Sequence, residues 1–279
     1  MSIAEHELLR LYPGPQARVP LEGLYLGEAL QEIGTPSAPF VYGNYITTLD
    51  GRIALTSPET GHREVPPPVV NRHDRWLYHE LVAHADVLIT SGSYLRELTL
   101  IRGRDLPSLG VNHHELKDWR RRRGLPQEPA IAVVSASLDL PPLVYDLAAA
   151  RDLCVVTGRD APREQRQALE ANGLTVLSAG TGSHVEGREL MQVLAARGHT
   201  TIYHATGPQG LHEVLAAGVV SRLYVTIAHR LVAGRAFDTL LYGSPFRLAP
   251  KLRMTSLYYD PDEPAGAGQW LARFDCERS

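Results

Sequence analysis

Residues 200–228 read TTIYHATGPQGLHEVLAAGVVSRLYVTIA and contain the pattern that decides the fold. The apolar run at 200–204 predicts a short buried strand, and the periodic segment after it predicts a helix at 209–217 that ends at Gly218. A second strand is predicted at 221–228. Two strands joined by a helix form a β-α-β unit, which is typical of a parallel sheet covered by helices. The stretch therefore indicates an α/β fold.

The same alternation continues on both sides of this stretch. Further strands are predicted at residues 40–46, 86–91, 130–135, 153–157 and 174–177, and further helices at 71–85, 113–123, 163–172 and 187–197. In the helix at 71–85, Asn71 is the expected N-cap, and Val70, Leu77 and Leu81 are expected on one face. The sheet is therefore expected to be mainly parallel and flanked by helices.

The two ends of the chain differ from this regular middle. Residues 1–38 are rich in Pro and Gly, and apart from a short helix at 5–11 they are expected to form an N-terminal arm. Residues 246–259 and 269–275 predict two strands joined by a Pro- and Gly-rich turn, which together form an antiparallel hairpin on a sheet edge. Because no linker is visible, residues 39–279 are expected to form a single domain.

The composition of the 279 residues excludes several classes of protein. Lys and Arg number 28 against 31 Asp and Glu, a net charge of −3, whereas nucleic-acid-binding proteins are usually basic. The two cysteines exclude a disulfide scaffold and a zinc site of paired cysteines. The first residues, MSIAEHELLRLYPG, lack a basic segment and an apolar core, so no signal peptide is expected. No membrane span is expected either, and we predict a cytoplasmic protein that binds small molecules.

Polar loops follow several of the predicted strands, where open parallel sheets bind their ligands. The segment ATGPQG at 205–210 opens a helix, whose N–H groups and dipole favour an anion such as a phosphate. The turn TTLDGR at 47–52 and the segment TSGS at 90–93 carry hydroxyls and glycines that suit contact with a cofactor. Each has a plainer interpretation: a tight strand-to-helix turn, a turn closed by Asp50 on its own backbone, and an ordinary loop.

Histidines and arginines offer weaker signals. His113 and His114 point to different faces of their helix, about 100° apart, so no metal site is expected there. The other, scattered histidines are expected at the surface or as caps: His62, His73, His79, His204 and His212. The basic run at 120–123 predicts a solvated helix end. An alternative hypothesis makes it part of an RNA- or phosphate-binding face with nearby Arg96, Arg102 and Arg104.

Taken in chain order, four blocks resemble the RibD-type C-terminal reductase family of riboflavin biosynthesis, whose fold is dihydrofolate-reductase-like. The block YITTLDGR at 45–52 is similar to the family's S-L-D-G-R after its first strand, and IYHATGPQGL at 202–211 is similar to its E-G-G-P-x-L before a helix. ADVLITSGSYL at 85–95 and AIAVVSASLDLP at 130–141 complete the series. The resemblance extends over residues 40–275.

The resemblance implies an NADPH-dependent reduction in which hydride passes to C1′ of a ribosylamino-pyrimidine. It implies a heterocyclic small-molecule substrate such as 5-amino-6-(5-phosphoribosylamino)uracil, and a homodimer. It makes Asp50 the catalytic residue, which also holds the first loop. The cofactor contacts carried over by position are Thr47, Thr48, Gly92, Ser93, Thr206, Gly207, Pro208, Gln209, Gly210 and Leu211. The substrate contacts carried over in the same way are Asn44, Arg63 and Ala205.

The substrate positions depart from the family's pattern more than the cofactor positions do. The family's Glu before its Gly-Gly turn, which helps to hold the substrate, aligns with Ala205, and the serine after its first loop aligns with Arg63. The substrate is therefore expected to be a related pyrimidine or a pterin, and the alternative is a catalytically diverged nucleotide-binding protein. The proton donor stays open among Asp50, His204 and water.

Overall fold

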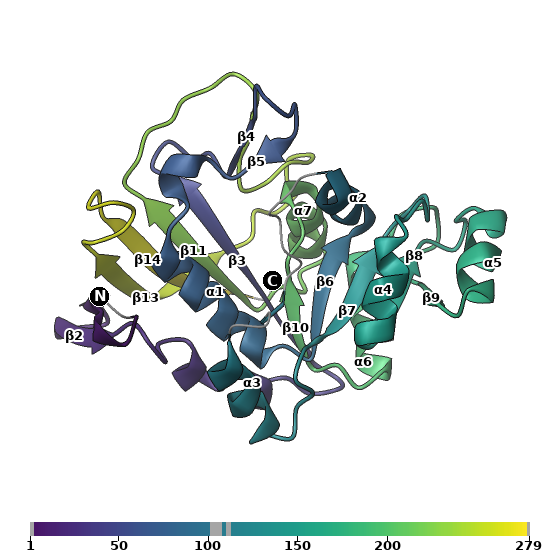
Figure 1. Cartoon of the computed structure of the whole chain (residues 1–279), viewed down its shortest axis with the longest axis horizontal. Helices are drawn as coiled ribbons and strands as arrows, with labels where there is room; N and C mark the ends of the chain where they lie inside the picture. Colours follow the sequence, from purple (N-terminus) through teal and green to yellow (C-terminus); the bar gives the residue numbers. More distant parts are fainter. Residues whose placement is uncertain (1–2, 101–107, 110–112, 278–279) are drawn as a thin grey trace. The chain divides into compact units, whose positions relative to one another are not determined.

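A computed structural model of the protein describes residues 3–100, 108–109 and 113–277 (Figure 1). The described residues fall into two compact units. The first unit comprises Met1–Glu28, Tyr42–Leu81 and Gly207–Ser279, and the second comprises Ala29–Val41 and Val82–Thr206. Each unit is therefore assembled from segments that are distant in the sequence.

The main sheet of the first unit has the strand order β2-β1-β13-β14-β11-β3. Its strands are β1 (Glu7–Tyr12), β2 (Ala17–Pro20), β3 (Phe40–Thr48), β11 (Arg222–Ala228), β13 (Leu252–Asp260) and β14 (Gln269–Cys276). Strands β11 and β3 run parallel, with Thr226 opposite Ile46, and the other neighbouring pairs are antiparallel. The parallel pair therefore lies at one side of an antiparallel set.

A smaller sheet and two helices complete the regular structure described for this unit. The smaller sheet joins β12 (Phe237–Asp238), β4 (Ala54–Thr56) and β5 (Arg63–Glu64) in that order. The helices are α1 (Arg72–His84), whose last turn enters the second unit, and α7 (Pro208–Ala216) (Figure 1). Leu211, Val214 and Leu215 recur at helical spacing on α7 and pack with Leu223 of β11, so one apolar face holds this helix in the core.

The sheet of the second unit is parallel, in the order β10-β6-β7-β8-β9. Its strands are β6 (Val87–Ser91), β7 (Ala130–Val134), β8 (Leu153–Thr157), β9 (Thr175–Ser178) and β10 (Thr201–His204). Its helices are α2 (Gly92–Leu100), α3 (His114–Arg121), α4 (Leu143–Ala150), α5 (Arg163–Ala171) and α6 (Gly187–Ala196). Short 3-10 turns occur at Ile3–Glu5, Leu26–Glu28, Leu30–Glu32 and Pro67–Val69.

Local signals placed most of these elements correctly. Asn71 caps α1 as predicted, because its Oδ1 accepts a hydrogen bond from the backbone N–H of Asp74 at 2.8 Å. Gly173, Gly198 and Gly218 follow their helices in the left-handed conformation, with φ of 85°, 90° and 67°. The predicted α/β class, with C-terminal antiparallel strands, is confirmed.

Three expectations are wrong: two concern the ends of the chain, and one concerns the start of α1. The helix predicted at 5–11 is strand β1, whose Leu8 is 1% exposed and whose backbone pairs with β2 and β13. That pairing also means that the hairpin of β13 and β14 does not lie on a sheet edge. Val70, expected on the buried face of α1, is 59% exposed, whereas Leu77 and Leu81 are buried. Helices α2 and α4 were not predicted.

Glu80 of α1 holds the segment that follows β2. Its carboxylate accepts hydrogen bonds from the backbone N–H groups of Gly23, Tyr25 and Leu26 and from the indole N–H of Trp76. Glu80 is fully buried, and burial raises its pKa, although these four hydrogen bonds act in the opposite direction. A buried carboxylate therefore attaches the N-terminal segment to α1.

Candidate functional site

Asp50 closes the turn that follows β3. Its carboxylate accepts hydrogen bonds from the Thr48 hydroxyl and from the backbone N–H of Ala233 at 2.9 Å, and Arg52 lies 3.5 Å away. The bond from Thr48, followed by those from Ala233 and Val232, lowers the pKa of Asp50 below its ordinary value. The carboxyl is therefore ionised at neutral pH, which suits holding the loop and does not suit donating a proton.

The two threonines of this turn use their hydroxyls within it. Thr48 is buried, and its Oγ1 donates to Asp50 and accepts from the backbone N–H of Arg52 at 2.9 Å. The Thr47 hydroxyl, which is half-buried, donates to the backbone carbonyl of Thr48 at 3.1 Å. Both hydroxyls are therefore hydrogen-bonded within the turn, and the contact of Thr47 and Thr48 with a nicotinamide stays a prediction.

Gly92 and Ser93 begin helix α2 at the end of β6. Ser91 caps this helix by accepting a hydrogen bond from the backbone N–H of Tyr94 at 3.1 Å. A Cβ atom on Gly92 would lie 2.9 Å from Cδ2 of Leu140 and 3.0 Å from Oγ of Ser135. Packing by itself therefore accounts for the glycine. Ser93 accepts a hydrogen bond from Arg96 at 3.1 Å, and a cofactor contact at either residue stays a prediction.

The segment from Ala205 to Leu211 leads from β10 into α7. Gly207 is the N-cap residue, Pro208 follows it, and within the described residues neither a side-chain cap nor an acidic residue in the first turn is found. Gly207 and Gln209 are exposed, and Gly210 is half-buried. Leu211 differs, because its side chain is 0% exposed in the core and its N–H bonds to the Gly207 carbonyl. The start of α7 is therefore an open helix terminus in which Leu211 has a packing role.

His204 stands directly before this segment and is 2% exposed. Burial lowers the pKa of His204 to about 4, against a smaller raising effect of a hydrogen bond to its own backbone carbonyl. Nε2 of His204 lies 3.0 Å from the Thr206 hydroxyl, and the tautomer of the imidazole decides which of the two donates. A neutral imidazole in this arrangement orients Thr206 and is not suited to donate a proton.

The residues predicted to contact substrate lie in separate places along the fold. Asn44 is half-buried in the middle of β3. Arg63 is in β5, where its Nε lies 3.4 Å from Oδ1 of Asp238. Ala205 is half-buried, and its backbone N–H donates to the carbonyl of Ile89. Their roles stay predictions.

Asp74, in the first turn of α1, is a candidate that the sequence did not single out. It is half-buried, and one carboxylate oxygen accepts a hydrogen bond from the hydroxyl of Thr226 on β11 at 2.6 Å. Burial raises its pKa to about 6, although the bond from Thr226 acts in the opposite direction. Acidic residues are common in the first turn of a helix. The sequence therefore gives no sign that Asp74 also contacts the sheet.

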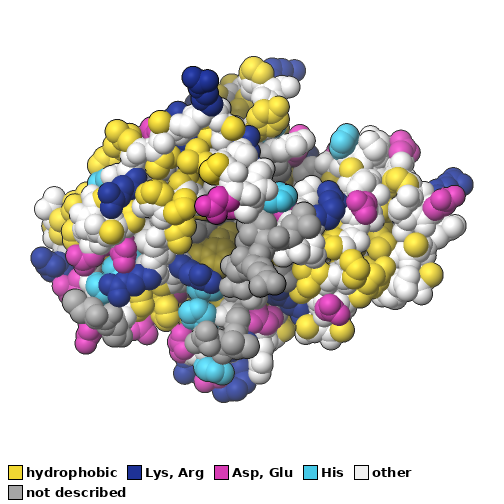
Figure 2. Space-filling view, turned by 45° about the horizontal axis from the view of Figure 1, so that its top comes forward, with side chains coloured by type: hydrophobic (Ala, Val, Ile, Leu, Met, Phe, Trp, Pro, Cys, Tyr) yellow, Lys and Arg dark blue, Asp and Glu magenta, His cyan; other side chains and the backbone are white. Residues whose placement is uncertain are grey.

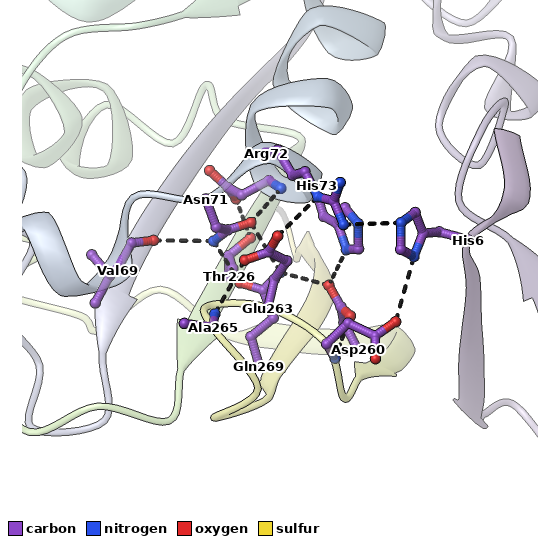
Figure 3. Close-up of polar contacts among 12 residues, drawn as sticks. His6, Val69, Asn71, Arg72, His73, Thr226, Asp260, Glu263, Ala265 and Gln269 are labelled. Atoms are coloured by element: carbon purple, nitrogen blue, oxygen red, sulfur yellow. Dashed lines mark hydrogen bonds and ion pairs between the residues drawn. The ribbon is translucent and has the colours of Figure 1, made fainter. Parts of the chain in front are cut away.

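A buried polar network holds the start of α1, as Figure 3 shows. His73 lies 2.8 Å from Asp260 at the end of β13, and Gln269 of β14 donates to the same carboxylate at 2.9 Å. Asn71 in turn donates to Gln269 at 2.9 Å. Burial opposes ionisation of Asp260, but the bonds from His73 and Gln269 bring its pKa below the ordinary value. The expectation that His73, His79 and His204 lie at the surface is wrong, since all three are buried.

Charged side chains do not merge into a basic surface on the face drawn in Figure 2, where Lys and Arg alternate with Asp and Glu. Arg120 was expected at a solvated helix end but is buried and donates to the backbone carbonyls of Ala83, Ala85 and Pro126. Arg123 lies over the ring of Trp119 at 3.8 Å. Arg102 and Arg104 lie outside the described residues.

The described part of the chain lacks two further features. It contains no group of three or more His, Cys, Asp or Glu side chains arranged to hold a metal ion. It also contains no helix with the length and apolar character needed to cross a membrane.

The family model of the RibD C-terminal domain matches residues 39–263. The chain belongs to this family. RibD relatives appear among solved structures, and a pyrimidine reductase-like protein of Corynebacterium diphtheriae matches with a TM-score of 0.71 and 22% identity, over 94% of this chain and 100% of that one. Acinetobacter baumannii RibD matches with a TM-score of 0.61 and 15% identity, over 86% of this chain and 58% of its own.

The riboflavin biosynthesis reductase of Saccharomyces cerevisiae has a TM-score of 0.55 and 12% identity, over 91% of this chain and 99% of its own. No curated protein matches the sequence. At these identities the solved structures support the fold. The chain therefore has the dihydrofolate-reductase-like α/β fold of the RibD reductase family.

Proposed function

We propose that the protein is an NADPH-dependent reductase of a small heterocyclic substrate, a pyrimidine related to 5-amino-6-(5-phosphoribosylamino)uracil or a pterin. The observation that carries the proposal is the RibD family match, which spans residues 39–263 and includes all the strand-end segments described above. When bound, the cofactor supplies hydride, and the protein supplies binding and orientation. We also propose, from the family, that the enzyme acts as a homodimer.

The start of α7 suits the phosphates of the cofactor. The first N–H groups of a helix have no partner within it, and the helix dipole favours negative charge there. Neither a capping side chain nor an acidic residue in the first turn competes for this position among the described residues. A Cβ atom on Gly207 would meet no atom within 4 Å, so space around the N-cap is open. Gln209 and Gly210 would hold phosphate through backbone N–H groups, Gly207 would leave space for it at the N-cap, and Pro208 has no N–H to offer.

Thr206 would contribute in a different way. Its hydroxyl, 3.0 Å from Nε2 of His204, would exchange a hydrogen bond with a polar group of the cofactor. The remaining cofactor residues of the proposal, Thr47, Thr48, Gly92 and Ser93, would act by the shape of their turns. Leu211 would support α7 from the core.

Ala205 supports a second candidate function. An alanine cannot replace the carboxylate by which the family holds its substrate, so a nucleotide-binding protein without turnover is the alternative. Asn44 and Arg63 would then have no substrate to contact. NADPH oxidation measured with a panel of pyrimidines and pteridines separates the two functions, because the alternative predicts binding without oxidation.

Gln209→Glu tests the phosphate site directly. The change is nearly isosteric and places a negative charge at the exposed first turn of α7, where it favours the helix and repels phosphate. We expect the Kd for NADPH in calorimetric titration to rise at least about tenfold, with thermal stability kept. NADH serves as the comparison ligand.

The matched control is Gln192→Glu, which adds the same charge at an exposed position of α6. Its Kd for NADPH should equal that of the wild type. Equal affinity of the Gln209→Glu and wild-type proteins would remove the phosphates from this helix terminus, and no binding of NADPH or NADH by the wild type would overturn the proposed function.

A further inference from the structure

Reduction of a C=N bond needs a proton as well as a hydride, and the residues considered so far do not supply it. Asp50 is held as a carboxylate by the turn after β3. His204 is a buried imidazole whose pKa is lowered to about 4 by burial, and its Nε2 is already hydrogen-bonded with the Thr206 hydroxyl. The proton donor of the reduction therefore lies elsewhere in the fold, and its assignment rests on the proposed function.

Asp74 has a position that suits this role. It lies in the first turn of α1, where Asn71 caps the helix and so places the side chain against β11. The Thr226 hydroxyl, 3% exposed, holds one carboxylate oxygen at 2.6 Å. Asp74 itself is half-buried, and its carboxyl is held against the sheet. Thr226, which holds Asp74, lies two residues before the end of β11.

The face of the sheet that Asp74 contacts also carries Asn44. The Tyr42 hydroxyl donates to the backbone carbonyl of Leu81, so this side chain of β3 faces α1. Side chains alternate along a strand, which places Asn44 and Ile46 on the same face as Tyr42. Ile46 lies opposite Thr226 in the parallel register, and Asn44 lies opposite Tyr224. Asn44 and Ile46 are half-buried, so α1 does not fully cover this face. A proposed substrate residue and Asp74 therefore share one partly open face.

The groups around Asp74 leave its charge uncompensated. Thr226 faces it from β11, Asn71 from its own helix, and Tyr25 from the N-terminal segment. Tyr25 also lies near Glu28, Glu80 and Tyr258, and the two arginines on this side, Arg222 and Arg273, are each ion-paired with Glu28 at 2.8 Å. The described residues provide Asp74 with no ion pair. Burial without a counter-charge raises the pKa of this carboxyl to about 6, which leaves about a tenth of it protonated at pH 7.

We propose that Asp74 is the proton donor of the reduction, and that Thr226 is the residue that positions it. As hydride adds to the carbon of the substrate C=N bond, the O–H bond of the Asp74 carboxyl breaks and a new N–H bond forms on the adjoining nitrogen. The C=N bond thereby gains two hydrogens, one as a hydride that would come with its two electrons from the reduced nicotinamide and one as the proton of Asp74, and the carboxylate left behind regains its proton from water.

Titration of the Asp74 carboxyl tests the inference without any turnover. In the intact protein labelled with carboxyl-13C aspartate, the signal absent from Asp74→Asn should titrate near pH 6. In Thr226→Val its midpoint should move to higher pH, because the lost hydroxyl had stabilised the carboxylate. Thr226→Ser, which keeps the hydroxyl, should restore the wild-type midpoint. A midpoint at the ordinary value of an aspartate would overturn the proposal.

Kinetics of the NADPH-loaded enzyme provide the second test. Asp74→Asn should slow hydride transfer about 100-fold at pH 7 and leave the Kd for NADPH within twofold. The wild-type rate should fall about tenfold per pH unit above the pKa, because only the protonated acid acts. Thr226→Val should move this fall to higher pH, and Asp118→Asn, an exposed change on α3, should match the wild type.

The outcomes separate the two proposals. A wild-type rate and pH profile in Asp74→Asn would overturn the role of Asp74 while the reductase function stands. A wild type that binds NADPH but reduces no pyrimidine or pteridine would overturn the reductase function, and the proton-donor role with it.

Discussion

The turn after β3 and the first turn of α1 each contain an aspartate held by a threonine hydroxyl, with opposite results. Asp50 also receives backbone N–H groups and an arginine, and its pKa is lowered. The carboxylate of Asp74 accepts a single hydrogen bond, from Thr226, and burial raises its pKa to about 6. One hydroxyl does not decide the charge of a carboxyl; the number of other donors and the access of water decide it.

The difference separates a structural role from a chemical one. Asp50 stabilises the fold by being ionised, because the loop from 230 to 234 is attached to it through Val232 and Ala233. Asp74 destabilises the fold when ionised, since the ordinary pKa of 3.8 is raised to about 6. A residue kept at such a cost is a functional candidate.

Glu80→Ala would sharpen the comparison most, because burial raises the pKa of Glu80 as it does that of Asp74, whereas several hydrogen bonds hold its carboxylate as they hold that of Asp50. Removing the carboxylate leaves the N–H groups of Gly23, Tyr25 and Leu26 buried without their acceptor. We expect the free energy of unfolding in urea to fall by about 3 kcal/mol. Glu22→Ala, an exposed change in the same segment, should stay within about 0.5 kcal/mol of the wild type. Equal stability of the two variants would refute the anchoring role of Glu80.

Asp74→Asn should stabilise the protein at alkaline pH. In the wild type the folded state holds the Asp74 proton more tightly than the unfolded chain, so stability falls as pH rises from 3.8 to about 6 and stays lowered above that range. The variant lacks this ionisation, and we expect a gain of about 2 kcal/mol at pH 8 that vanishes near pH 4. Urea unfolding at the two pH values measures it. A loss of stability at pH 8 would contradict the uncompensated charge.

Asp50→Asn should show the opposite sign and a smaller effect. The lowered pKa of Asp50 contributes stability above the ordinary value of 3.8, and this contribution disappears as pH falls through the folded pKa. We therefore expect a loss of about 1 kcal/mol at pH 7 that shrinks as the pH falls below 3.8, measured by the same urea unfolding. If the loss persisted unchanged at low pH, the charge of Asp50 would not hold the turn.

Much of the fold was predictable from the sequence because its signals are local. Asn71 caps α1 from three residues away, and Gly218 ends α7 by its backbone freedom. The strand β1 was not predictable in this way. ELLRLY is compatible with a helix, and only pairing with β2 and β13, which lies some 250 residues away, makes it a strand.

The candidate site likewise has features that the sequence predicts and features that depend on the tertiary structure. The sequence by itself determined where the strand-end segments lie and, through their order, the family, because those features depend on periodicity and on neighbouring residues. Only the tertiary structure decided which side chains have which charge. Asp74 meets Thr226 across 152 positions of the chain, and Asp50 meets Ala233 across 183. The pKa of a carboxyl depends on the donors and the water around it in space, and that environment exists only once distant segments have packed together.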